Sequence, residues 1–175
     1  AALPHLKAAL NRARTDSLAL PARFGLLALA NDQRQDLSEQ AAKENAGARL
    51  AVALRAPNDC RDVGQLLVMH RSALFDDLSA PRKHLASDLL QWIVRFDGLR
   101  RPGRLPLIMA AANAWSDGSH AELARSLESA VKAAQSIDAG AIARPLAKAG
   151  PEAIAHALNN ARREAIESQM APKTD

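Results

Sequence analysis

The sequence predicts an all-α protein: a multi-helix bundle followed by a smaller C-terminal helical part. Apolar residues recur at the three- and four-residue spacing of helices along most of the 175 residues, and no useful stretch alternates as a strand would. Hydrophobic residues make up 48% of the chain but aromatic residues only 3%. The core must therefore be built from Leu, Ile, Val and Ala at close helix contacts, and a chain of this length can bury such a core without disulfides or a metal.

Several helices are expected before residue 101. Apolar spacing predicts short helices at 3–10, 24–29 and 50–54, and residues 36–39 favour a further helix start. Pro57-Asn58-Asp59 opens a longer helix with an acidic group near its positive end. Another helix is expected to start at Ser79-Ala80-Pro81 and to end at Gly98. Its apolar stripe consists of Leu85, Leu89, Trp92, Ile93 and Phe96.

The segment 100–106 interrupts the helical pattern, because it contains two prolines and a glycine. We place a domain boundary there, which divides the chain into a helical domain at 1–101 and a C-terminal helical tail at 102–175. A short buried helix is expected at 107–114, and Ser119-His120-Ala121-Glu122 matches a capping box that starts a helix running to about Ile137. The last helix is expected from Pro151 to about Met170, followed by a disordered tail at 171–175.

Composition and charge exclude some classes of protein. The lone Cys60 cannot form an internal disulfide and has no ligand partners at zinc spacing, so we interpret it as a small buried hydrophobic residue in a reducing compartment. No apolar run reaches the roughly 20 residues of a membrane span, and residues at the start of the sequence lack the basic-then-apolar pattern of a signal peptide, so a cytoplasmic protein is expected. The net charge of +4 is modest, but arginines gather around residues 95–104 and 162–163, where guanidinium groups suit phosphates. The simpler interpretation of these clusters is a set of solvated helix ends.

No motif in the chain predicts catalysis. The five histidines stand outside any HExxH motif, His-Asp pair or His/Cys cluster. No glycine-rich phosphate loop follows a strand, and no Ser-His-Asp arrangement can be identified. Adjacent acids such as Asp76 and Asp77 are more typical of solvated turns than of acid-base sites.

Four segments in order nevertheless resemble the HD-domain half of bacterial multifunctional CCA-adding tRNA nucleotidyltransferases. They are residues 23–30, 56–70, 96–104 and 150–166, and together they extend over nearly the whole chain. The resemblance implies an HD-domain-like helical bundle. In that family the HD domain holds a divalent metal through a first His, a His-Asp pair and a later Asp.

The metal site of the family looks erased in this chain. Only His5 matches a ligand position, whereas Leu29-Ala30 stands at the place of the His-Asp pair, and neither residue can ligate a metal. The histidine-rich loop of relatives corresponds to 41–45, which contains no histidine. His70 matches a family histidine, and we interpret it as a helix histidine in a polar contact. Residues 112–117 also depart from the acidic and arginine-containing pattern of the family.

The resemblance implies a tRNA-binding or scaffolding region of an enzyme that builds the tRNA 3′ end. The catalytic head of that enzyme carries strand-borne carboxylates and a Gly-Ser phosphate loop, which these residues lack, so this chain alone is not expected to be catalytic. The implied partners are tRNA, an N-terminal nucleotidyltransferase head and a second copy in a homodimer, with no DNA and no membrane. No cofactor is expected in the chain itself, while the parent enzyme would use Mg²⁺ with ATP and CTP. The candidate RNA-binding residues are Arg100, Arg101, Arg104, Arg162 and Arg163.

Two alternatives stay open beside this interpretation. The first is a structural dimerisation module, in which the stripe from Leu85 to Phe96 would form the face between subunits. The second is a residual HD phosphohydrolase, which needs a metal site that the sequence does not supply.

Overall fold

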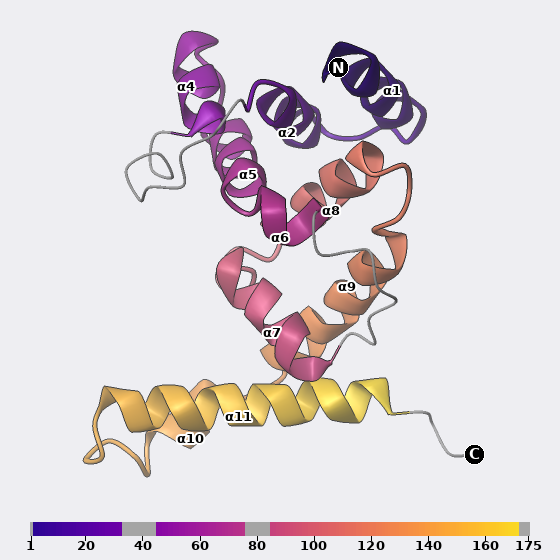
Figure 1. Cartoon of the computed structure of the whole chain (residues 1–175). Helices are drawn as coiled ribbons and strands as arrows, with labels where there is room; N and C mark the ends of the chain where they lie inside the picture. The colour runs from indigo at the N-terminus through magenta and orange to yellow at the C-terminus, as the bar shows by residue number, and fades with distance from the viewer. Residues whose placement is uncertain (1, 33–44, 76–84, 172–175) are drawn as a thin grey trace. The chain divides into compact units, whose positions relative to one another are not determined.

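The described part of the chain is all-helical. The computed structural model describes residues 2–32, 45–75 and 85–171, and these form ten helices and no strand (Figure 1). The all-α class predicted from the sequence is confirmed. None of the described helices is long and apolar enough to cross a membrane.

The chain divides into two compact units that interleave along the sequence. Unit 1 consists of residues 1–82 and 103–124, and unit 2 of residues 83–102 and 125–175. One border between the units, after Pro102, lies next to the predicted boundary after Arg101. The division into domains 1–101 and 102–175 itself stays a prediction.

Unit 1 is built around helix α5. The helix α2 (Leu20–Ala30) packs against both α5 (Asn58–Met69) and α8 (Arg104–Trp115), and α4 (Ala46–Ala53) packs against α5 (Figure 1). The helix α1 (Ala2–Thr15) covers α2 and α8, and the short α6 (Arg71–Phe75) follows α5. Fully buried side chains that form this core include Leu26, Leu29, Val63, Leu67, Leu74 and Ile108.

Helices α4 and α5 cross in backbone contact. A Cβ atom on Gly47 would lie 2.4 Å from the carbonyl carbon of Gly64 and 2.6 Å from the amide nitrogen of Gln65. Asn45 fixes the start of α4 at this crossing, because its side-chain oxygen accepts the amide of Ala48 at 3.2 Å while its amide donates to the Gln65 carbonyl at 2.8 Å. The pair of glycines therefore sets how closely the two helices approach.

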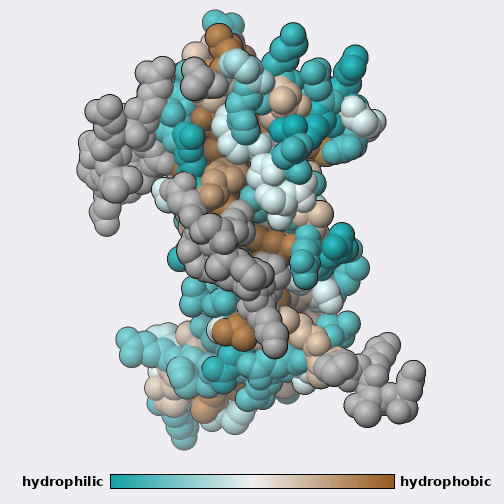
Figure 2. Space-filling view, turned by 45° about the vertical axis from the view of Figure 1, so that its right-hand side comes forward, coloured by the Kyte–Doolittle hydropathy of each residue, from teal (hydrophilic) through white to brown (hydrophobic). Residues whose placement is uncertain are grey.

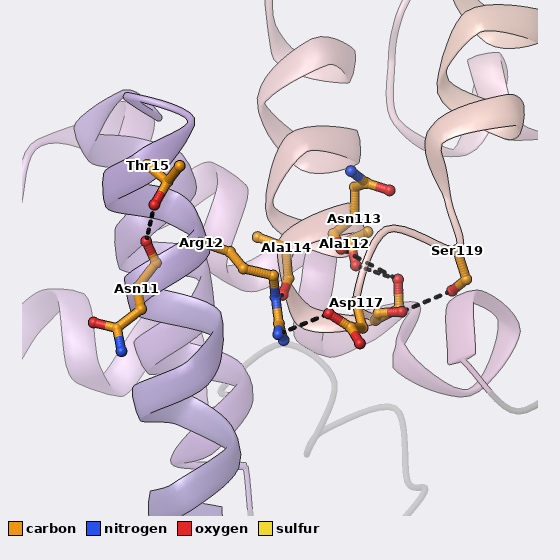
Figure 3. A network of polar contacts seen from close by, with 9 residues as sticks. Asn11, Arg12, Thr15, Ala112, Asn113, Ala114, Asp117 and Ser119 are labelled. Atoms are coloured by element: carbon orange, nitrogen blue, oxygen red, sulfur yellow. Dashed lines mark hydrogen bonds and ion pairs between the residues drawn. The ribbon is translucent and has the colours of Figure 1, made fainter.

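Arg12 joins α1 to the end of α8. Its Nε donates to the carbonyl of Ala114 at 2.7 Å, and a terminal nitrogen of its guanidinium pairs with Asp117 at 2.9 Å (Figure 3). Asp117 has a φ of 57°, which places it in the left-handed region of the turn after α8. Arg12 thus holds a turn that is more than 100 residues away in sequence.

Unit 2 is organised around the packing of α7 (Ala86–Arg95) on α11 (Pro151–Met170). Leu89, Ile93 and Phe96 from the first segment are fully buried, as is Ile166 of α11. The short α10 (Ala139–Ala143) also packs on α11, and most of α9 (Ala121–Gln135) belongs to this unit. The face of α11 seen in Figure 2 carries largely hydrophilic side chains, as expected for a helix with one buried residue among the 20 that it contains.

Several predicted elements are found with shifted bounds. The long helix predicted from Pro57 ends at Met69 and is followed by α6, while the helix predicted at 107–114 begins three residues earlier as α8. The last helix has the predicted bounds, and α10 was not predicted. The predicted helix starts at 36–39 and 79–81 lie outside the described residues, as does most of the tail that was expected to be disordered.

The predicted capping box at 119–122 is wrong in its bonding. The hydroxyl of Ser119 donates to the carbonyl of Ser116 at 3.0 Å (Figure 3). The amide of His120 is satisfied by the side chain of Asn113 at 3.1 Å. The Ser119 hydroxyl thus bonds back into the turn after α8 instead of capping α9. The prediction that Cys60 is a buried residue is confirmed, because its side chain lies in a cluster with Phe24 and Ala51.

Candidate RNA interface

The arginine-rich segment begins on a well-defined turn at the end of α7. Phe96 caps the helix, and the amide of Gly98 donates back to the carbonyl of Ile93 at 2.7 Å. Asp97 adopts a φ of 54°, and its carbonyl accepts the amide of Arg101 at 2.9 Å. These bonds fix the backbone of the turn, so the side chains of Arg100 and Arg101 leave it from defined positions.

Arg100 and Arg101 are exposed on this turn. The side chain of Arg100 keeps 83% of its surface exposed, and its Nε lies 4.0 Å from a carboxylate oxygen of Asp97. An ion pair at that distance and exposure contributes little to stability, about 0 to 1 kcal/mol. Its loss on binding a phosphate would therefore cost little.

Arg104 has a different environment, although it is close in sequence. It belongs to unit 1, at the first position of α8, and its guanidinium pairs with the carboxylate of Asp62 on α5. Only 14% of its side chain is exposed. The ion pair links α5 to α8, and a phosphate would have to compete with it.

Arg162 and Arg163 lie side by side in sequence on α11 but differ in burial. Arg163 is exposed, with its Nε 3.8 Å from Glu167. Arg162 is half-buried, and its Nε is a buried donor without a hydrogen-bond partner among the described residues. Of this pair, Arg163 is the better placed to meet a phosphate.

Sequence reasoning missed an aromatic contact beside the turn. The guanidinium of Arg95 lies over the ring of Trp92, 5.2 Å from its centroid, and the Trp92 ring stacks with that of Phe96 at 5.3 Å and an angle of 17°. Trp92 and Phe96 were assigned only to the apolar stripe of the helix. The signal that could have revealed the contact is the spacing of three residues between Trp92 and Arg95, which places the two side chains on neighbouring turns of one helix face.

The stripe proposed as a dimer face is mostly used inside unit 2. Leu89, Ile93 and Phe96 are fully buried in the chain, and of the stripe only Leu85 is mainly exposed, at 59%. Residues buried in this way cannot form a face between subunits, so the dimerisation alternative loses the observation on which it was based.

The positions equivalent to HD ligands do not form a cluster of ligands. Leu29 is buried in the core of unit 1, and Ala30 ends α2. His5 is exposed on α1, with its ring edge-on to Trp115 at 4.4 Å between centroids. No group of three His, Cys, Asp or Glu side chains that could hold a metal occurs in the ranges that the structure describes. His70 is the half-buried C-cap residue of α5. The segment 41–45, where the resemblance places a histidine-rich loop, lies mostly outside the described residues.

Comparison with known proteins identifies a family. A multifunctional CCA protein from Paraburkholderia phytofirmans is 32% identical to this chain over 124 residues, which cover 67% of the chain and 29% of that protein. The chain is homologous to part of the multifunctional CCA proteins. Similar matches are found with the multifunctional CCA proteins of Cupriavidus pinatubonensis, at 32% identity over 134 residues, and Methylobacillus flagellatus, at 30% over 125 residues. No known family profile and no solved structure matches the chain significantly.

The match with multifunctional CCA proteins is partial in both directions. It covers 67% to 70% of this chain but only 29% to 30% of those relatives. The resemblance drawn from the four sequence segments is thereby confirmed at the level of the family. The small fraction of each relative that the match covers is consistent with a C-terminal part of such a protein. The HD-like character of the bundle stays a prediction.

Proposed function

We propose that this chain is a tRNA-contacting region of a CCA-adding tRNA nucleotidyltransferase and serves the maturation and repair of tRNA 3′ ends. The observation that carries the proposal is the similarity to multifunctional CCA proteins over about two thirds of the chain. The chain spans about 30% of the length of those relatives. Nucleotide addition would then be the work of an N-terminal nucleotidyltransferase head, which would use Mg²⁺ with ATP and CTP.

Arg100 and Arg101 are the residues that we expect to contact tRNA first. Both are exposed on a fixed turn, and the nearest carboxylate to the Arg100 side chain is a weak partner at 4.0 Å. Arginine forks bind phosphate oxygens in two-point contacts, and such contacts position an RNA by its shape without reading its sequence. Arg163 is expected to make a weaker contact of the same kind. The half-buried Arg104 and Arg162 are expected to support their helices.

The test is a filter-binding titration of the 175-residue chain with tRNA at several salt concentrations. For each phosphate contact that is lost, the slope of log affinity against log salt should fall by about one, and all tRNAs should be weakened alike. The double variant R100A/R101A should therefore reduce the slope of log affinity against log salt by about two. The matched control is R14A/R61A, which removes two exposed arginines of unit 1 and thus the same net charge.

An equal loss in both double variants would mean that the chain attracts tRNA only through its total charge. Unchanged affinity and slope in R100A/R101A, with the helical signal in circular dichroism intact, would contradict the contact. The R104A variant separates the structural role of an arginine from its role in binding phosphate. It should lower the melting temperature of the chain and leave the salt slope of tRNA binding nearly unchanged.

A further inference from the structure

The end of α7 carries a stack of three side chains that the proposed phosphate contacts do not use. Phe96 forms its base and is fully buried. The half-buried Trp92 ring lies nearly parallel to it, 5.3 Å away between centroids, and the exposed Arg95 lies over Trp92. Of these three side chains, Phe96 is therefore anchored in the core, and Arg95 lies at the surface.

The guanidinium of Arg95 lies over the Trp92 ring without any bound partner. A cation over a tryptophan face at this distance is attracted by the ring, and the planar guanidinium can also stack on it. Ordering a long side chain normally costs free energy on binding, and a side chain that is already held in place loses less. The face of Arg95 turned away from Trp92 is therefore a prepared planar surface.

The immediate surroundings of the stack are basic. The segment from Trp92 to Pro102 contains Arg95, Arg100 and Arg101 against the single acid Asp97, so its net charge is 3 − 1 = +2. The turn places Arg100 and Arg101 directly after the helix end that carries Arg95. A plane for stacking and two exposed guanidinium groups for phosphates therefore share one short segment.

We propose that Arg95, held over Trp92, stacks with an unpaired base of RNA while Arg100 and Arg101 bind the flanking phosphates. Unpaired bases of RNA stack on aromatic rings and on arginine planes, whereas paired bases keep their faces inside the helix. The proposal rests on the proposed function and narrows it: the RNA contacted here has at least one base out of a duplex. An acidic peptide could satisfy the three arginines but would have no use for the stacked plane.

The experiment compares two RNA probes on the full 175-residue chain. The probes are a single-stranded oligoadenylate and a fully paired RNA hairpin with the same number of phosphates. The central variant is Arg95→Lys, which keeps the charge and removes the plane. It should weaken oligoadenylate binding by roughly fivefold or more, the lower end of what one stacked base contributes, and leave hairpin binding and the salt slope unchanged. The matched control is Arg14→Lys on α1, an exposed arginine of unit 1, which should affect neither probe.

Fluorescence gives a second measurement that does not depend on affinity. Trp92 is the sole tryptophan of a chain carrying Trp115→Phe, since the sequence has two. Oligoadenylate should quench its emission, the hairpin should not, and Arg95→Lys should abolish the quenching. Trp92→Phe, which keeps an aromatic ring on Phe96, should retain most of the discrimination between the two probes.

Three results would overturn the proposal. They are an Arg95→Lys chain that binds oligoadenylate as the parent does, an equal loss for both probes, and competition by polyglutamate as strong as that by oligoadenylate of equal charge. If the first result is found while R100A/R101A still lowers the salt slope for tRNA, the stack is wrong and the proposed function stands. If R100A/R101A has no effect on either RNA, the proposed function fails with it.

Discussion

His120 shows how much a single side chain of the turn after α8 is constrained. It is fully buried, its Nε2 donates to the carbonyl of Leu74 at 2.9 Å, and its Nδ1 lies against the hydroxyl of Ser116. A carbonyl can only accept, so the proton of the neutral ring sits on Nε2. The hydroxyl of Ser116 has one proton and two neighbouring acceptors, Nδ1 of His120 and the carbonyl of Ala112 at 2.8 Å. Burial lowers the pKa of His120, although the bond to Leu74 acts in the opposite direction.

This lowered pKa predicts a loss of stability in mild acid. Below the ordinary value of 6.5, the unfolded chain binds a proton that the folded chain does not yet bind. The contribution of His120 to the free energy of unfolding should therefore be constant above pH 6.5. It should decrease as the pH falls below 6.5, by at most about 1.4 kcal/mol per pH unit for one group.

Urea unfolding between pH 7.5 and 5 measures the effect, with His120→Gln as the variant and the exposed His156→Gln as the matched control. The slope of the free energy of unfolding against pH, measured below pH 6.5, should become smaller in His120→Gln only. The same slope in all three chains would show that His120 does not cause the pH dependence.

At the scale of elements, the crossing of α4 and α5 gives a prediction of steric origin. Gly47→Ala would bring a methyl group to 2.4 Å from the backbone of Gly64, and backbone atoms cannot move aside as a flexible side chain can. Overpacking of this kind typically costs about 1 to 3 kcal/mol. The melting temperature should fall accordingly, by several degrees.

Gly103→Ala is the matched control for this substitution. No atom lies within 4 Å of a Cβ built on Gly103, and its φ of −67° suits any residue. The cost there should stay within roughly 0.5 kcal/mol, since the change affects mainly a helix cap. An equal shift in the two variants would mean that the helices separate easily to admit the methyl group.

Helices were predictable from the sequence where an apolar stripe and a terminal residue agreed. The last helix has both, with Gly150-Pro151 before it and a regular stripe through Ile154, Leu158 and Ile166, and its bounds were predicted as found. The α10 helix has only five residues, of which none is buried, so no stripe could reveal it. Ser119 matched a capping pattern, but its hydroxyl donates to the carbonyl of Ser116, and Asn113 from the preceding helix binds the amide of His120. Such contacts with the preceding turn and helix cannot be seen in the capping pattern itself.

The candidate site was predictable only in part, for a similar reason. Clustering in sequence grouped Arg100, Arg101 and Arg104, yet Arg104 pairs with Asp62, which is 42 residues away. A partner so distant in sequence is set by how the helices pack. The stack of Arg95 on Trp92 is local and carries a readable spacing, but the same spacing also serves an ordinary core stripe.

At the scale of the whole molecule, the similarity to multifunctional CCA proteins leads to a prediction about metal-dependent chemistry. The similarity extends over 67% of the chain, while Leu29 and Ala30 stand where the resemblance places a His-Asp pair. The Leu29 side chain fills part of the core of unit 1, so a small local movement could not bring a metal ligand from elsewhere into its place.

The purified chain is therefore expected to have no metal-dependent phosphatase or 2′,3′-cyclic phosphodiesterase activity. Such activities need a divalent ion to polarise the phosphate and activate water, and aliphatic side chains supply no nitrogen, oxygen or sulfur to hold it. The measurement is the hydrolysis of a generic phosphoester and of a 2′,3′-cyclic nucleotide with Ni²⁺, Mn²⁺ or Mg²⁺ added. The matched variant is His5→Ala, because His5 is the one residue that the resemblance matches to a metal ligand. Both chains should show the background rate of the buffer with each metal. Turnover that rises with added metal and disappears in His5→Ala would contradict the loss of the site, since it would require His5 to leave the Trp115 ring and to find further ligands elsewhere in the chain.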